Sequence, residues 1–270
     1  MDTIPENHTA ETREIRARLR DIEATDGVRV LYACESGSRA WGFPSTDSDY
    51  DVRFVYVHPP DWYLSIALEG KRDVIERPIT DDLDISGWDL RKALRLLRKG
   101  NPPLIEWLGS PIVYLDRYGV AARMRDLATR HYHPVAAMYH YLHMAQGNYR
   151  DYLKGETVWL KKYLYVLRPL LAIRWIEDGL GVVPTEFQKL VAGVVDDPVL
   201  REAIERLVEA KRQGTELGYA PRIPPINDYI ERELARLEGT RFEQLIPRAA
   251  IPIEEYDALF RAVLQEVWGR

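Results

Sequence analysis

The sequence has one cysteine, no long apolar run and no excess of positive charge. Cys34 has no second cysteine to pair with, so a disulfide-stabilised secreted scaffold is excluded. No apolar stretch reaches the roughly 18 residues that cross a bilayer, and the first residues, MDTIPENHTA, do not have the composition of a signal peptide. There are 37 Lys and Arg against 42 Asp and Glu, and the net charge of -5 excludes a general nucleic-acid-binding surface. We expect a soluble, cytoplasmic protein with no membrane contact, in which any binding of a polyanion is local.

The chain has enough length and apolar content for two lobes, with 270 residues of which 46% are hydrophobic. Residues 11–22 have helical spacing of Ile and Leu, which predicts a helix that ends near Gly27. It is followed by the extended segments VRVLYAC, DYDVRFVYV, KRDVIERPI and DLDIS, and by the helical segment WDLRKALRLLRKG. Beyond these, amphipathic helix-length segments are separated by Gly and Pro. The sequence therefore predicts an α+β protein, with a catalytic domain built on a small mixed sheet over residues 1–110 and a helical bundle over residues 111–270.

Carboxylates precede or begin two of the predicted strands. Side chains alternate along a strand, so Asp49 and Asp51 share one face and lie about 7 Å apart, while the opposite face, with Val52 and Phe54, forms the core. Asp84 stands at the start of a later strand, and Asp82, two residues earlier, ranks below it because it can be a solvated strand start. If the two strands are neighbours, a third carboxylate meets the first two. Oxygen ligands of this kind suit Mg²⁺ or Mn²⁺, and two such ions can clamp a phosphoryl transfer.

The same acidic segment is also compatible with a simple turn or with a calcium-binding loop. Within STDSD, Asp47 and Asp49 can make side-chain turns, as Asp and Ser commonly do. The segment begins like a calcium-binding loop, but its sixth position is Val52 and its twelfth is His58, where such a loop needs Gly and Glu. The calcium-loop interpretation is therefore excluded, and the turn interpretation stays open.

A Gly-Ser pair lies between the first predicted strand and a short helix. Gly37 lets the backbone amides turn outward, and a helix that begins near Ser38 directs its free N–H groups toward an anion. The Ser38 hydroxyl can donate a hydrogen bond to the same anion, and Arg39 can add positive charge or form a structural ion pair. This turn is the predicted phosphate-binding part of the site.

The combination of these motifs resembles a known superfamily. Gly37 and Ser38, a ten-residue spacer and DYD before an apolar strand are similar to the signature of polymerase-β-like nucleotidyltransferases. The strings ESGSRAWGF, STDSDYDVRF, DISGWDLRKAL, EWLGSPIVY and KKYLYVLRP resemble, more narrowly, the predicted nucleotidyltransferases associated with bacterial RNA-repair genes. The resemblance implies a palm-like sheet that binds an NTP as a metal complex, with Gly37 and Ser38 on its phosphates. Asp49 and Asp51 would ligate two Mg²⁺ or Mn²⁺ ions, and Asp84 would be the third catalytic and metal-binding carboxylate.

A polar seam is predicted in the most apolar helical segment, TVWLKKYLYVLRPLLAIRWI. Lys161, Tyr165 and Arg168 follow one another at i, i+4 and i+7 and so share one side of a helix. In related nucleotidyltransferases a helical lobe closes the nucleotide cleft and offers a cation to the triphosphate and a ring to the base. This seam can do the same, with Lys162 as an adjacent candidate. The alternative is that these side chains pair with acidic residues on neighbouring helices.

The segment RKALRLLRKG concentrates five positive charges near the proposed site. They are Arg91, Lys92, Arg95, Arg98 and Lys99. An exposed helix face accounts for them in one interpretation, and a bound RNA strand does so in the other, because a local patch can neutralise several phosphates on an acidic protein.

These observations together predict an enzyme with its active site between the two lobes. It transfers NMP from an NTP, with ATP favoured, to an acceptor hydroxyl and releases pyrophosphate. Asp84 takes or orients the acceptor proton, since a carboxylate beside metal ions stays ionised and close to the nucleophile. The favoured acceptor is the 3′ end of RNA. Two alternatives stay open: adenylylation of a protein Tyr, Ser or Thr, as in related minimal nucleotidyltransferase antitoxins, and nucleotide binding without catalysis by a regulator.

Overall fold

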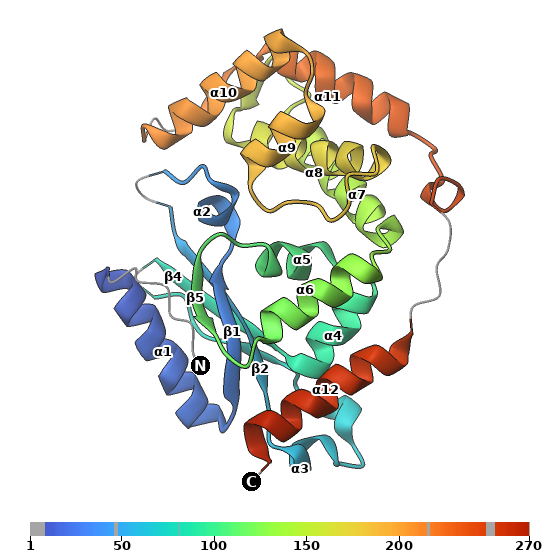
Figure 1. Cartoon of the computed structure of the whole chain (residues 1–270). Helices are drawn as coiled ribbons and strands as arrows, with labels where there is room; N and C mark the ends of the chain where they lie inside the picture. The colour runs from blue at the N-terminus through green and yellow to red at the C-terminus, as the bar shows by residue number, and fades with distance from the viewer. Residues whose placement is uncertain (1–8, 46–47, 81, 215–216, 247–251, 270) are drawn as a thin grey trace. The chain divides into compact units, whose positions relative to one another are not determined.

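The computed structural model describes residues 9–45, 48–80, 82–214, 217–246 and 252–269 (Figure 1). The chain forms two compact units by its internal contacts. The sheet unit contains residues 1–40, 49–132 and 250–270, and the helical unit contains residues 41–48 and 133–249. Within the described ranges, no helix is both long and apolar enough to cross a membrane.

The sheet unit is built on a five-stranded mixed sheet in the order β3-β4-β2-β1-β5. Its strands are β1 (Arg29–Glu35), β2 (Tyr50–Val57), β3 (Val74–Glu76), β4 (Leu83–Asp89) and β5 (Val113–Asp116). Strands β2 and β4 run parallel, and the remaining neighbours are antiparallel. The predicted mixed sheet is confirmed, and β5 is an additional edge strand that the sequence analysis did not identify.

Helices cover both faces of this sheet. They are α1 (Ala10–Asp26), α4 (Leu90–Arg98), α5 (Pro102–Leu108), α6 (Val120–Arg130) and α12 (Ile253–Trp268), with the short α3 (Pro60–Tyr63) and η1 (Leu68–Gly70) between strands. Helix α1 begins at Thr9, whose hydroxyl accepts the Thr12 N–H, and ends at Gly27, whose φ of 64° favours glycine. Helix α12 packs on α4 and α6, so the end of the chain returns to the sheet unit.

The core face of β2 is the predicted one, but the strand is buried on both sides. Val52 and Phe54 lie in one cluster with apolar side chains of α1, as the alternation predicts. Val55 and Val57, on the opposite face, are also buried. The reason is that α4 packs on β2, and α5 and α6 pack on the adjacent β1.

The helical unit is an assembly of α-helices with one small strand pair. Its elements are α7 (Val135–Tyr152), β6 (Thr157–Trp159), α8 (Lys161–Glu177), α9 (Phe187–Val194), α10 (Pro198–Arg212), β7 (Tyr219–Pro221), α11 (Pro224–Leu237) and η2 (Phe242–Gln244). Helix α8 is buried along most of its length, as its apolar sequence predicts. The segment predicted as its first turn is instead strand β6, because β-branched and aromatic residues pair there with β7.

The boundaries of the two units differ from the predicted division at residue 110. The sheet unit continues to residue 132 because β5 pairs with β1 and α6 packs on the same strand. It also includes α12, which was predicted as part of the helical bundle.

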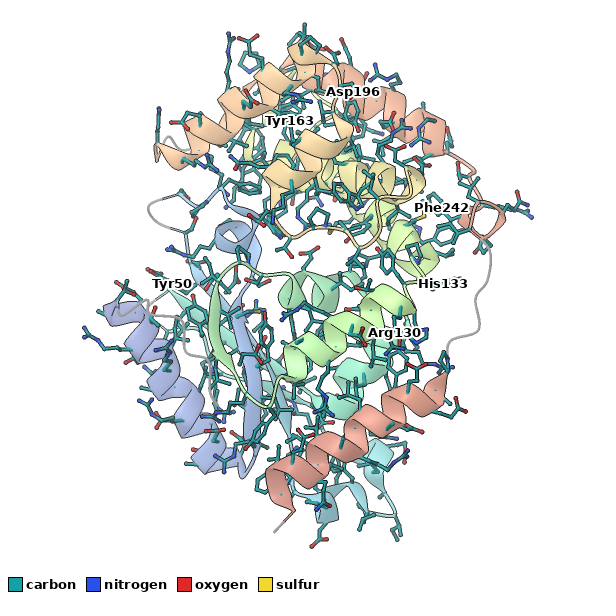
Figure 2. The ribbon with its side chains drawn as sticks, in the orientation of Figure 1. Tyr50, Arg130, His133, Tyr163, Asp196 and Phe242 are labelled. Carbon is teal, nitrogen blue, oxygen red and sulfur yellow. The ribbon has the colours of Figure 1, made fainter. Side chains whose placement is uncertain are left out.

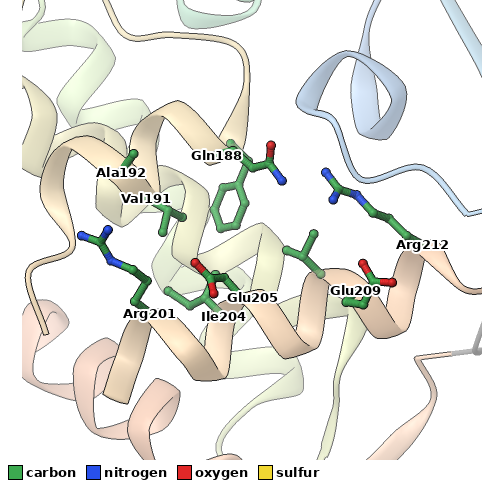
Figure 3. Close-up of a pocket in the computed structure, with 10 residues that line it drawn as sticks. Gln188, Val191, Ala192, Arg201, Ile204, Glu205, Glu209 and Arg212 are labelled. Carbon is green, nitrogen blue, oxygen red and sulfur yellow. The ribbon is translucent and has the colours of Figure 1, made fainter. Parts of the chain in front are cut away.

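The spacer between the Gly-Ser pair and Asp49 belongs to the helical unit, and we call residues 41–48 the strap. Phe43 packs edge-on against Phe187 of α9, with ring centroids 5.4 Å apart. The guanidinium of Arg212, at the end of α10, donates to the Gly42 carbonyl at 2.5 and 3.1 Å. Figure 3 shows Arg212 beside Gln188, at one end of a cavity of about 350 Å³ between α9 and α10. The ten-residue spacing therefore provides enough chain to leave the sheet unit and return to it.

Candidate active site at the start of strands β2 and β4

The register between β2 and β4 brings two of the predicted carboxylates together. Asp51 and Asp84 are directly opposed Cα partners on these parallel strands, next to Tyr50, which is labelled in Figure 2. Parallel neighbours lie about 4.8 Å apart, so both side chains reach the same region. The condition stated from the sequence, that the two strands are neighbours, is therefore met. Asp82 lies just before β4 in the left-handed conformation, and its carbonyl accepts the Tyr50 N–H at 2.7 Å, so it serves the turn rather than the carboxylate pair.

Arg53 supplies the positive charge between these carboxylates. Its guanidinium donates to Asp51 Oδ1 at 3.1 Å and to Asp84 Oδ2 at 2.7 Å. It also donates to the Val52 and Asp84 carbonyls, each at 3.1 Å, which fixes its direction. Alternation along the strand puts Arg53 on the same face as Asp51, but no role was predicted for it from the sequence. The i, i+2 spacing was the available signal, because it puts the two side chains side by side.

The carboxylate oxygens of this site are chemically suited to bind a magnesium or manganese ion. Asp51 and Asp84 already share one cation, and their carboxylate oxygens are the ligands that these metals prefer. Asp49, which precedes β2, is the third residue that would hold the metal. Within the described ranges, no group of three or more His, Cys, Asp or Glu side chains has the arrangement of a metal site. A metal bound to Asp51 and Asp84 would therefore compete with the Arg53 guanidinium.

The pKa of the Asp51 carboxyl reflects this environment. Burial raises it, and Arg53 opposes the rise, whereas the charges of Asp84 and Asp49 add to it. An additional cation near Asp51 would lower the pKa of its carboxyl, because the cation stabilises the ionised form.

Glu35, at the end of β1, fixes the backbone of Asp51. Its side chain is fully buried and accepts the Asp51 N–H at 2.8 Å and the Tyr114 hydroxyl. The neighbouring Ser36 N–H donates to the Asp51 carbonyl at 2.8 Å. Burial raises the pKa of Glu35, and the hydrogen bond from Tyr114 opposes that rise. The sequence analysis missed this residue. A carboxylate directly after the buried strand VRVLYAC was the signal that could have identified it.

Gly37 lies against the Asp51 carboxylate. Its φ is 59°, and a Cβ at this position would be 2.1 Å from Asp51 Oδ2, so no other residue fits without displacing that side chain. Gly37 begins the short helix α2 (Gly37–Trp41), which also contains Ser38 and Arg39. Arg39 donates to the Asp49 carbonyl at 3.1 Å and lies 3.9 Å from the Tyr50 ring centroid. The predicted phosphate-binding turn and the predicted metal-binding carboxylates are therefore adjacent within the sheet unit.

The predicted seam on α8 is not a continuous polar face. Arg168 is 1% exposed, its guanidinium lies 4.8 Å from the centroid of the strap residue Trp41, and it donates to the Thr185 carbonyl at 3.4 Å. Arg168 therefore packs in the interior of the helical unit, whereas the other seam residues are more exposed. Tyr165 is half-buried and meets the Trp41 ring edge-on, with centroids 5.6 Å apart. Lys161, at the start of α8, is exposed.

Lys162 is surrounded by aromatic rings. Its ammonium lies 4.5 Å from the ring centroid of Tyr152, 5.2 Å from that of Trp159 and 5.0 Å from that of Tyr165. Burial lowers the pKa of Lys162, and the nearby charge of Lys161 lowers it further. The nucleotide-binding role of Lys161, Lys162, Tyr165 and Arg168 stays a prediction.

The five basic residues of α4 divide into two groups. Lys92 pairs with Asp73 at 2.8 Å, and Arg91 lies 3.4 Å from Glu69. The others, Arg95, Arg98 and Lys99, are exposed, and no ion pair joins them to another described residue. Strand β4 rises about 3.3 Å per residue and ends at Asp89, about 16 Å along the strand from Asp84, and α4 begins at the next residue, Leu90. From the sequence we expected these basic residues near the proposed site. At this end of α4 they are not directly beside the carboxylates.

Comparison with known proteins is consistent with these features. The chain matches the model of the RNA repair pathway DNA polymerase beta family over residues 12–262. It is 49% identical over 250 residues to YcgL, an uncharacterised protein of Bacillus subtilis strain 168, and the match covers 93% of this chain and 95% of YcgL. It also resembles the crystal structure of a nucleotidyltransferase-like protein from Exiguobacterium sibiricum 255-15, with 14% identity and a TM-score of 0.30 over 95% of this chain and 80% of that one. The predicted resemblance is confirmed by the family match, and the chain belongs to the RNA repair pathway DNA polymerase beta family.

Proposed function

We propose that the protein transfers NMP from an NTP, with ATP favoured, to the 3′ hydroxyl of an RNA end. The observation that carries this proposal is the register of β2 and β4, which opposes Asp51 to Asp84 while Gly37 lies against the Asp51 carboxylate. Carboxylates beside a glycine turn suit a triphosphate whose negative charge is neutralised by cations. Family membership supports nucleotidyl transfer, and the family's association with RNA repair supports RNA as the acceptor.

The reaction forms a phosphoester bond and breaks a phosphoanhydride bond of the NTP. The acceptor oxygen forms a bond to the α-phosphorus, the bond from that phosphorus to the bridging oxygen breaks, and pyrophosphate leaves. Asp84 takes or orients the proton of the acceptor hydroxyl. Gly37 and Ser38 hold the phosphates, and Asp49, Asp51 and Asp84 would hold two Mg²⁺ or Mn²⁺ ions, which would supply charge neutralisation at the phosphates.

Glu35 and Arg53 hold the site residues in place before a metal ion binds and competes with the guanidinium. Arg53 keeps Asp51 and Asp84 together by donating to both. Glu35 holds the Asp51 backbone through its N–H, which limits the positions that the Asp51 carboxylate can take. Preorganised side chains of this kind reduce the cost of ordering the site when the substrate binds.

The experiment incubates the full chain with each labelled NTP, Mg²⁺ or Mn²⁺, total RNA and cell lysate, and then separates nucleic acid from protein. We expect label on RNA 3′ ends, and no label when those ends are oxidised with periodate. Asp51→Asn should abolish transfer. Asp82→Asn is the matched control, because Asp82 lies in the turn before β4 and Asn tolerates its positive φ, so transfer should persist.

Other results would contradict the proposal. Label found only on protein would favour a protein adenylyltransferase. A thermal shift with ATP, but no pyrophosphate release with any acceptor, would favour a nucleotide-binding regulator.

A further inference from the structure

A groove of about 500 Å³ lies between α4 and α12 in the sheet unit, at a surface that the carboxylate site does not use. Helix α4 contributes most of its charge, and α12 contributes most of its apolar and aromatic surface. The lining residues are Arg91, Leu94, Arg95, Arg98 and Lys99 from α4 and its C-cap, and Ile253, Tyr256, Asp257 and Phe260 from α12.

The groove is strongly positive on a protein that is negative overall. It holds one carboxylate, Asp257, and four cations, of which Arg91 also lies 3.4 Å from Glu69 outside the groove lining, whereas the whole chain has a net charge of -5. Arg95, Arg98 and Lys99 are exposed, and no ion pair neutralises them among the described residues. A cluster of like charges destabilises the helix that carries it unless an anion binds there. The groove is therefore suited to a polyanion.

The spacing of the arginines matches a chain of phosphates rather than a single one. Arg91, Arg95 and Arg98 follow at i, i+4 and i+7 and share one face of α4. A rise of 1.5 Å per residue separates them by about 6 Å and about 4.5 Å along the helix axis. Three guanidinium groups in a line can contact successive phosphates of one strand.

The α12 side of the groove suits bases and sugars. Ile253 is exposed although it is apolar, and the half-buried Phe260 offers an aromatic ring. Tyr256 is 3% exposed, and its hydroxyl has no hydrogen-bond partner among the described residues. Burial raises the pKa of this hydroxyl, so it keeps its proton and its capacity to donate. A positively charged wall beside an aromatic wall is the usual construction of a single-strand binding site.

We infer that the groove between α4 and α12 binds the sugar–phosphate backbone of a single-stranded nucleic acid. The identification of that strand as the RNA acceptor rests on the proposed function. Arg91, Arg95 and Arg98 contact the phosphates, and the α12 side chains contact the bases or sugars. The groove gives the acceptor strand a binding surface apart from the carboxylate site.

The test measures binding without chemistry, in EDTA and without NTP. The probe is a fluorescein-labelled single-stranded RNA of 12 nucleotides, followed by anisotropy with the full chain. Arg95→Glu with Arg98→Glu should weaken binding at least tenfold. It should also reduce the slope of log K against log salt by about 1.4, because each lost phosphate contact accounts for about 0.7 on a single strand.

A matched control changes the net charge by the same amount in the helical unit. Lys189→Glu with Arg206→Glu reverses two exposed cations on α9 and α10, and binding should stay within twofold of the wild type. An equal loss of RNA affinity in the two double variants would overturn the inference, because affinity would then depend on net charge alone. A DNA strand of the same sequence distinguishes the two sources of a phosphodiester backbone, and binding of DNA without RNA would overturn the assignment to RNA.

Two further results separate this inference from the proposed function. RNA binding that depends on Arg95 and Arg98, with no transfer of NMP to any acceptor, would support the inferred role of the groove and contradict the proposed reaction. If the Arg95→Glu, Arg98→Glu variant transfers NMP to RNA with the wild-type rate and KM, the proposed reaction is supported and the inferred role of the groove is contradicted. Preferential, charge-dependent binding of polyglutamate over RNA would assign the groove to an acidic protein and overturn the inference.

Discussion

The charged side chains of the predicted site are compensated differently in the two units. In the sheet unit, Arg53 forms hydrogen bonds with two carboxylates, Asp51 and Asp84. In the helical unit, Lys162 lies among aromatic rings and Arg168 lies on Trp41. A cation removed from a carboxylate pair leaves two like charges together, whereas one removed from a ring leaves a neutral surface. The sheet unit therefore has a site where one cation can replace another, whereas Lys162 and Arg168 of the helical unit lie against aromatic rings.

The largest effect that this comparison predicts is at Glu35. Glu35→Ala removes the acceptor of two buried groups, the Asp51 N–H and the Tyr114 hydroxyl. Each unsatisfied group costs about 1–3 kcal/mol, so the free energy of unfolding should fall by about 4 kcal/mol in urea titrations. Glu35→Gln is the control, because it keeps one acceptor oxygen and should cost about 1 kcal/mol. A loss below about 1 kcal/mol in the Ala variant would show that Asp51 does not depend on Glu35.

A carboxylate that forms no ion pair with another described residue extends the comparison to the pH dependence of stability. Asp89, at the end of β4, is 1% exposed and accepts the Tyr63 hydroxyl and the Arg91 N–H, and burial raises its pKa from 3.8 to about 6. Because the folded-state pKa is the higher one, Asp89 stabilises the fold when protonated, and that contribution is lost as the pH rises from about 4 to about 6. The full contribution of Asp89 to the free energy of unfolding is about 3 kcal/mol.

The measurement is the free energy of unfolding of the wild type minus that of Asp89→Asn across this pH range. The difference should decrease as the pH rises and then stay constant. Asn stays neutral at every pH and retains an acceptor oxygen, so it removes the titration and keeps the cap. A difference that stays level between about pH 4 and about pH 6 would place the Asp89 pKa at its ordinary value.

Removal of Arg53 tests the cation site directly. Arg53→Met leaves Asp51 opposite Asp84 with no positive charge between them, and we expect the free energy of unfolding to fall by about 2 kcal/mol, since both carboxylates are about one-third exposed. Mn²⁺ should then raise the melting temperature of the variant more than that of the wild type, because the metal no longer competes with the guanidinium. Asp51→Asn combined with Arg53→Met is the control and should lose this response. An Mn²⁺ shift equal to that of the wild type would argue against a metal between these strands.

The smallest effect is expected at Lys162, in the helical unit. Lys162→Met keeps the apolar stem against Tyr152, Trp159 and Tyr165 and removes only the charge. A partly exposed cation on aromatic rings contributes less than about 1 kcal/mol, so thermal unfolding should change little. A loss as large as that of Arg53→Met would contradict the comparison.

Local patterns explain which parts of the structure were predictable from the sequence. Alternation and helical spacing predicted α1, β1, β2 and α4 because each signal lies within one element. The sequence placed Asp51 on one strand and Asp84 at the start of another, and the parallel register brings the two together.

The features that were missed depend on contacts between distant segments. Strand β5 is four residues long and pairs with β1, so its own sequence carries little periodic signal. The burial of Arg168 results from Trp41, which is more than a hundred residues earlier in the chain. Helix α12 looks like any amphipathic helix, and only its packing on α4 and α6 assigns it to the sheet unit. No pattern within these segments specifies the partner.

The return of α12 to the sheet unit has a consequence for the order in which the protein is synthesised. Residues of the sheet, including both carboxylate strands, are translated before the helical unit, but α12 is translated after it. Until then the surfaces of α4 and α6 that α12 covers stay open, and the groove has only its positive wall. A nascent chain that stops before residue 253 would carry the carboxylates of β2 and β4 but no complete groove between α4 and α12. The groove that we infer to bind a strand would therefore form only once α12 has been added.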